Sequence, residues 1–202
     1  MVLARIGDSH LFVATPEKVA VPYVKIFSME QDLSGFRPSR LWKQMSTEKR
    51  LDAAELFWSD EHSTEQQIEA IGSLAGHMKF RTKSVVALPV DRKAKYLVAL
   101  PNVSDSIAAR ALVNYHLARQ RPMMAAFLDA LGITHEEGLI AEENVTAPGL
   151  DKMRDAATEL ASTYPADDVS LYFSTLVSQD PDTWSTLVDL PQTAGGGSPA
   201  VA

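Results

Sequence analysis

Apolar residues recur every three or four positions through most of the chain, which is the spacing of helices that bury one face. The pattern is clearest from Ser104 to Ile133, where it divides into two segments around the hinge Arg119-Gln120-Arg121-Pro122. Ser104 is a favourable N-cap residue, Pro122 suits the first turn of a second helix, and Gly132 is placed to end that helix. We therefore predict two consecutive helices. The side chains expected to be buried in the first are Ile107, Ala108, Ala111, Leu112, Tyr115 and Ala118.

The same spacing, less regular, continues on both sides of this stretch. Further helices are predicted after the cap residues Ser46 and Ser63, and again from about Leu150, Asp168 and Asp180 onward. The sequence therefore predicts an all-α fold, an irregular bundle of about eight to ten helices, several of them short.

The residues directly after Ile133 carry a helix-start signal. Thr134-His135-Glu136-Glu137 has the form of a capping box, in which a Thr or Ser is followed three positions later by a Glu. We therefore expect a further short helix to begin at once.

The two ends of the chain lack the helical pattern. Residues 19–27 are rich in β-forming side chains, but Pro22 interrupts them, so 1–36 is predicted to be an extended or poorly ordered arm. Disorder and a natural chain that begins further upstream are the competing interpretations. Residues 37–191 are predicted to form a single helical domain, and the glycine-rich residues 192–202 a disordered tail.

Composition excludes several classes of site. The 202 residues include no cysteine, so disulfides, thiolate zinc sites and a cysteine nucleophile are ruled out. No apolar run approaches the roughly 18 to 20 residues of a membrane span. Asp8 and His10 interrupt the apolar stretch that a signal peptide would need. We expect a cytoplasmic protein that makes no use of a membrane.

Charge is unevenly distributed around the central stretch. Residues 79–121 hold nine Lys or Arg against two acids, whereas residues 134–202 hold two against twelve. Such an asymmetry indicates either a face that binds anions or an attraction between two parts of the same molecule.

The basic segment supplies the candidates for a polyanion site, because phosphate contacts need only positive charge on one face. The competing interpretation is a solvated helical surface paired with the acidic last third. No nucleic-acid motif is present, aromatic residues such as Phe80 and Tyr96 are sparse in the segment, and the net charge of the chain is -7. These features argue against a dedicated nucleic-acid binder.

No catalytic or cofactor motif is legible, and we predict neither a cofactor nor a metal. The histidines do not pair at metal-ligand spacing. His116 and His135 are the candidates for a general base if the protein is an enzyme of unknown reaction. The acidic cluster Glu136, Glu137, Glu142 and Glu143 is interpreted as a charged helix face rather than a cation site.

These observations favour a non-enzymatic interaction or regulatory module with an unknown protein partner. We expect a helical groove around Tyr115 to Phe127 to bind that partner through apolar side chains and a basic rim. Nucleic-acid or other polyanion binding, and an enzyme using His116 or His135, are the alternatives. The predicted binding residues are Arg81, Lys83, Arg92, Lys93, Tyr115, Arg119, Arg121 and Met123.

Overall fold

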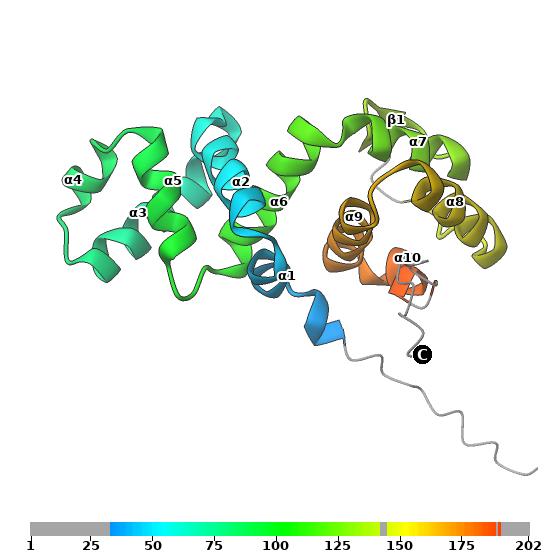
Figure 1. Cartoon of the computed structure of the whole chain (residues 1–202), viewed down its shortest axis with the longest axis horizontal. Coiled ribbons are helices and arrows are strands. Elements are labelled where there is room, and N and C mark those ends of the chain that lie inside the picture. The colour runs from blue at the N-terminus through cyan, green and yellow to red at the C-terminus, as the bar shows by residue number, and fades with distance from the viewer. Residues whose placement is uncertain (1–32, 142–144, 189, 191–202) are drawn as a thin grey trace, which may run out of the picture. The chain divides into compact units, whose positions relative to one another are not determined.

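The computed structural model of the protein describes residues 33–141, 145–188 and 190 (Figure 1). These residues form ten α-helices, three short 3-10 helices and one β-hairpin. The first six α-helices are α1 (Pro38–Gln44), α2 (Thr47–Ser59), α3 (Thr64–Met78), α4 (Thr82–Val86), α5 (Val90–Ala99) and α6 (Asp105–Arg119). The other four are α7 (Arg121–Leu131), α8 (Leu150–Thr163), α9 (Ala166–Gln179) and α10 (Pro181–Trp184).

The remaining elements are short. They are the 3-10 helices η1 (Leu33–Phe36), η2 (Glu61–Ser63) and η3 (Ser185–Val188), and the strands β1 (His135–Glu136) and β2 (Leu139–Ile140). The predicted all-α fold is confirmed. The predicted arm lies outside the described residues except for Leu33–Phe36, which forms η1 rather than an extended segment, and the predicted tail lies outside them entirely. In the described ranges, every helix is too short or too polar to cross a membrane.

The buried apolar residues form two clusters. The N-terminal cluster comes from α1 to α6, where α2 packs on α5 and α6, α1 on α6, and α3 on α4 (Figure 1). The C-terminal cluster comes from α7 to α10 and η3, where α7 packs on α8, and α9 on α10 and η3. The largest fully buried side chains of the first are Leu41, Trp42, Phe57, Leu74, Leu97, Ile107 and Leu112, and those of the second are Met123, Phe127, Leu128, Met153 and Leu187.

Helix α6 contributes to both parts of the fold. It packs against α1, α2 and α3, and it also packs against α9 and α7. The Ser104 hydroxyl accepts a hydrogen bond from the Ile107 N–H and caps the helix as predicted. The predicted buried stripe is correct except for Ala118, which is exposed. Because α6 is covered on more than one side, Asn114 and His116 are buried as well.

The prediction of a helix at residues 134–137 is wrong, because the chain forms a tight β-hairpin there. His135 pairs with Ile140, and Glu136 with Leu139. The turn needs positive φ at two residues, Glu137 (49°) and Gly138 (88°), and Gly138 adopts it without strain. A Cβ on Gly138 would lie 2.7 Å from Met124 Cβ on α7. The turn therefore also requires glycine because any larger residue would collide with Met124.

Candidate functional site

The positive residues at the α6–α7 hinge are held by internal ion pairs. Arg119 donates to both carboxylate oxygens of Asp52, at 2.7 and 2.8 Å. Arg121 pairs with Glu137, and its Nε donates to the Leu117 carbonyl at 2.6 Å. The charge asymmetry of the sequence is therefore used partly within the molecule, and neither arginine is available as a free cation.

The positive residues of α5 are only partly engaged. The Lys93 ammonium lies 5.0 Å from the centre of the Trp58 ring, which is a cation–π distance. Lys95 lies 3.6 Å from Asp91, an exposed pair one helical turn apart. Arg92 is exposed and forms no ion pair within the described ranges.

A different arrangement is found where α3 turns into α4, at residues 78–88, which we name the α3–α4 corner. Helix α3 ends at Lys79, whose φ of 55° is left-handed. The Phe80 N–H then donates to the Ala75 carbonyl at 3.0 Å, which fixes the chain as it leaves the helix. Val85 is fully buried and anchors α4. Phe80 and Val86 remain 46% and 55% exposed.

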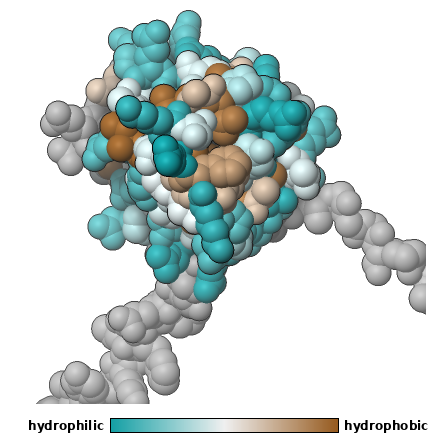
Figure 2. All heavy atoms as spheres, turned by 90° about the vertical axis from the view of Figure 1, so that its left-hand side faces the viewer, coloured by the Kyte–Doolittle hydropathy of each residue, from teal (hydrophilic) through white to brown (hydrophobic). Residues whose placement is uncertain are grey.

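The α3–α4 corner combines these apolar side chains with positive charge. Lys79, Arg81 and Lys83 are exposed, and none forms an ion pair or side-chain hydrogen bond among the residues that the structure describes. No acidic residue occurs between 78 and 88. Figure 2 shows this face of the molecule, with apolar side chains gathered near its middle and hydrophilic ones around them. The corner can therefore offer apolar contact and unpaired positive charge at one place.

Of the groove predicted around Tyr115 to Phe127, the structure shows only a pocket that Leu117 and Met124 line in part. Met123 is 2% exposed and Phe127 is completely buried, because both belong to the C-terminal cluster. Met123 therefore offers almost no surface to a partner. Tyr115 is 6% exposed and contributes only an edge, beside Lys49 and Arg119, to a hollow of about 540 Å³.

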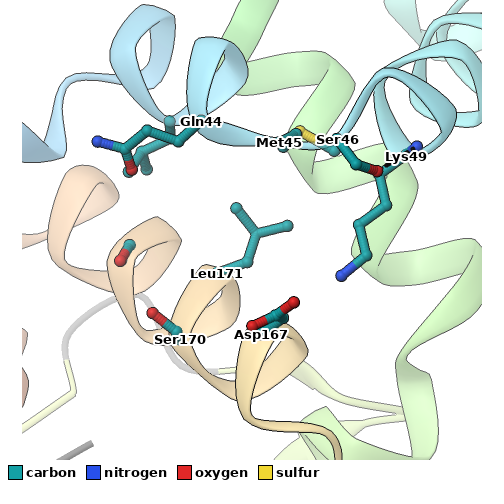
Figure 3. A pocket seen from close by; sticks show the side chains of 9 residues that line it. Gln44, Met45, Ser46, Lys49, Asp167, Ser170 and Leu171 are labelled. Carbon is teal, nitrogen blue, oxygen red and sulfur yellow. Dashed lines mark hydrogen bonds between the residues drawn. The ribbon is translucent and has the colours of Figure 1, made fainter. Parts of the chain in front are cut away.

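A second hollow, of about 360 Å³, lies between the α1–α2 connection and α9. Figure 3 shows Lys49 extending from α2 toward Asp167 and Ser170 on α9. Its lining is mostly polar and comes from Leu41, Gln44, Met45, Ser46, Lys49, Asp167, Ser170, Leu171 and Ser174.

Lys49 is the residue of this hollow that could act as a nucleophile or a base. Its ammonium donates to Asp168 Oδ1 at 2.7 Å. Burial by itself lowers the pKa of Lys49, but the bond and the attraction to Asp168 outweigh burial, so the pKa is raised. Lys49 is therefore a structural cation that joins α2 to α9 and not a nucleophile or base.

His116 is buried and engaged at both ring nitrogens. Nδ1 pairs with the side-chain amide of Gln120. Nε2 pairs with the Thr175 hydroxyl at 3.0 Å, and that hydroxyl donates its proton to the Leu171 carbonyl at 2.8 Å. Burial lowers the pKa of His116 to about 4, although Gln120 and Asp168 oppose that change. The ring is therefore neutral at physiological pH and is a weak base.

His116 also borders a pocket of about 240 Å³ under the β-hairpin. The pocket is lined by Val113, His116, Leu117, Met124, Gly138, Leu139, Ile140, Tyr172, Thr175, Leu176 and Gln179. No carboxylate is among these lining residues, so the described structure supplies no acid partner for a His116 general base.

His135, the other histidine candidate, braces the hairpin. Its Nδ1 accepts from the Gly138 N–H at 3.1 Å, and its Nε2 lies 3.1 Å from Asp129 Oδ1. His135 and His116 do not line the same pocket. Of the acidic cluster, Glu142 and Glu143 lie outside the described residues. The described parts of the chain contain no group of three His, Asp or Glu that could hold a metal.

A polar network surrounds Asp60, and the sequence did not predict it. The Asp60 carboxylate accepts from Ser63 Oγ at 2.5 Å, Arg110 at 2.9 Å and Asn114 at 3.1 Å. Partial burial alone raises the pKa of Asp60, but these bonds and one from the His62 N–H outweigh it and lower the pKa to about 2. The network joins η2 to α6 and is structural, since it leaves no carboxylate oxygen without a donor.

Comparison with known proteins adds no relative to this description. No protein-family model matches the chain, and neither do any curated protein or solved structure. The function is therefore argued from the geometry of the chain itself.

Proposed function

We propose that the protein is a non-enzymatic interaction module that binds an acidic, amphipathic segment of a partner protein at the α3–α4 corner. The observation that carries this proposal is the combination of exposed Phe80 and Val86 with the unpaired cations Lys79, Arg81 and Lys83. Apolar anchors supply most of the binding energy of such interfaces, and charges around them guide the approach and orientation of the partner.

The charge of the α3–α4 corner selects the chemistry of the partner. A segment with Asp or Glu beside Leu or Phe, repeated at helical spacing, would bury its apolar face on Phe80 and Val86. Its carboxylates would meet Arg81 and Lys83. Fully solvated cations lose little hydration in such rim contacts, so these pairs contribute mainly to specificity and association rate.

A nucleic-acid ligand is less well supported by the same geometry. Arg119 and Arg121, which the sequence groups with the basic segment, are paired with Asp52 and Glu137. A phosphate backbone also gains nothing from the exposed Val86 side chain.

A selection from displayed peptides tests the proposal directly. The full chain is used to select binders from a library of random helical peptides, and each binder is measured again with Phe80→Ser and with Arg81→Glu/Lys83→Glu. We expect acidic amphipathic peptides to be enriched and both variants to weaken them by roughly tenfold or more.

The matched control is Ile68→Ser on α3. Ile68 is 66% exposed, but its neighbours in the sequence include Glu65 and Glu69, so this substitution should leave peptide binding unchanged. Binders that are basic, or that bind the Phe80→Ser variant equally well, would contradict the proposal. Salt-dependent binding of a DNA duplex that is lost in the Arg81→Glu/Lys83→Glu variant would instead support a polyanion site.

A further inference from the structure

The pocket beside His116 has the chemistry of a small-molecule site. Its apolar walls come from Val113, Leu117, Met124 and Leu176, and from the hairpin residues Leu139 and Ile140. Leu139 is 45% exposed, so the wall that the hairpin provides also reaches solvent. The pocket is partly open to solvent, so a ligand can enter it.

The polar side chains of the pocket are few, and two of them, Tyr172 and Gln179, make no side-chain hydrogen bond to the described residues. Tyr172 is 3% exposed, lines the pocket, and its hydroxyl makes no hydrogen bond to the described residues. Burial raises the pKa of Tyr172, so the hydroxyl keeps its proton and can donate it. The hydroxyl can therefore donate a hydrogen bond to a ligand oxygen in the pocket.

Charge restricts the ligand further. Every described residue that lines the pocket is uncharged when His116 is neutral, as its lowered pKa requires at physiological pH. An ionised ligand would lose its hydration on entering and would find no opposite charge there. The ligand must therefore be neutral.

The volume of the pocket limits the size of the ligand. A volume of about 240 Å³ exceeds the roughly 150 Å³ of an apolar cavity that accepts benzene, and lies below the range of most drug-sized sites. We propose that this pocket binds a small, uncharged, single-ring or short-chain molecule that carries one carbonyl or ether oxygen, with Tyr172 donating a hydrogen bond to that oxygen. This site is separate from the α3–α4 corner and does not depend on the function proposed for it.

Three probes of the same shape test the proposal. Acetophenone carries the acceptor oxygen, ethylbenzene lacks it, and benzoate replaces it with a charge. Each is titrated into the ¹⁵N-labelled full chain, and the amide shifts of Val113, Gly138 and Leu176 are followed by NMR. We expect saturable shifts with acetophenone, weaker binding of ethylbenzene, and no saturable shift with benzoate at the same concentration.

Two variants separate the pocket from nonspecific binding. Tyr172→Phe keeps the ring and removes the hydroxyl, and it should weaken acetophenone by roughly threefold to tenfold while leaving ethylbenzene unchanged. Val113→Phe fills the pocket and should abolish both, with the amides of α2 confirming that the variant is folded. Benzoate binding as tightly as acetophenone, absence of any shift, or an unchanged preference in Tyr172→Phe would overturn the proposal.

Discussion

The two apolar clusters of this protein are built from different side chains. In the N-terminal cluster, six alanines of α2, α3, α5 and α6 have no exposed surface, and they allow the helices to approach closely around Trp42 and Phe57. These alanines are Ala53, Ala54, Ala70, Ala94, Ala108 and Ala111. In the C-terminal cluster, the ring centre of Phe127 lies 4.9 to 6.2 Å from those of Tyr172, Phe173 and Trp184. The N-terminal cluster thus combines small side chains with the Phe57–Trp58 ring pair, 5.1 Å apart, whereas the C-terminal cluster gathers several rings around Phe127.

The polar groups beside the clusters differ in the same way. The N-terminal cluster is bordered by the carboxylate of Asp60, whose ionised form is favoured by the folded protein. At the boundary with the C-terminal cluster lies His116, whose neutral form is favoured by the folded protein. Acid therefore acts on the two parts through different groups and in different pH ranges.

The largest effect is expected from removing one ring from each cluster. Phe57→Ala and Phe127→Ala should each lower the free energy of unfolding by about 3–5 kcal/mol, because each leaves a cavity in a closed core. Trp42 and Trp58 report on the N-terminal cluster, and Trp184 on the C-terminal cluster. Chemical denaturation followed by fluorescence, in Trp184→Phe and Trp42→Phe/Trp58→Phe backgrounds, measures each part separately.

We expect both reporters to change together in either variant. Helix α9 packs against α1 and α6, and Lys49–Asp168 and His116–Thr175 join the parts, so the clusters should unfold as one unit. If Trp184 changes at a lower denaturant concentration than the other reporters in Phe127→Ala, the clusters are independent.

The next effect concerns His116. Its pKa is lowered from 6.5 to about 4, so the neutral folded form is fully favoured above pH 6.5 and loses that advantage as the pH falls toward 4. The free energy of unfolding should fall by about 3 kcal/mol across this range. His116→Gln should remove most of that dependence, whereas the exposed His77→Gln should keep it. Denaturant titrations at several pH values measure the slope, and equal slopes in all three proteins would refute the assignment.

The smallest of the three effects belongs to Asp60. Its pKa is lowered from 3.8 to about 2, so the ionised form stabilises the fold above pH 3.8, and that contribution is lost as the pH falls to 2. Asp60→Asn should be less stable than the unchanged protein by about 2 kcal/mol at pH 7. The difference should shrink between pH 4 and pH 2 when both are unfolded in urea. The exposed Asp155→Asn is the control, and a difference that does not vary with pH would show that charge is unimportant.

Much of the helical architecture could be predicted from local signals. Ser46 and Ser104 cap helices as expected, and the Asp180 side chain accepts from the Thr183 N–H at the start of α10. Gly132, at φ 65°, ends α7. These signals act within one turn of a helix, so the sequence contains all the information that they need.

The local signals failed where a distant contact decides the structure. The capping-box pattern at Thr134 gave way to a hairpin, because Gly138 packs against Met124 on another element. Ser63 does precede α3, but its hydroxyl is committed to the Asp60 network and not to the cap. Asp60 is only three residues from Ser63, but Arg110 and Asn114, which complete the network, are 47 and 51 residues away.

The candidate sites were still harder to predict. His116 meets Thr175 across 59 residues, and Asp60 meets Arg110 across 50, so their environments depend on how the helices pack. The sequence identified His116 and Arg81 as residues of interest, but not the pocket beside one or the exposed Phe80 beside the other. Arg119 and Arg121 belong to the same basic segment as Arg81 in the sequence. In the structure they differ from Arg81 because each forms an ion pair, with Asp52 and Glu137 respectively.

Lys79 carries a conformational cost at the α3–α4 corner. Its backbone conformation, with φ of 55°, favours glycine, and a residue with a Cβ there is strained by about 1 kcal/mol. Glycine would relieve that strain and would also remove a positive charge next to Phe80. Stability and charge therefore make opposite demands on this position, and natural or laboratory selection for heat resistance alone would favour a protein with a less basic corner.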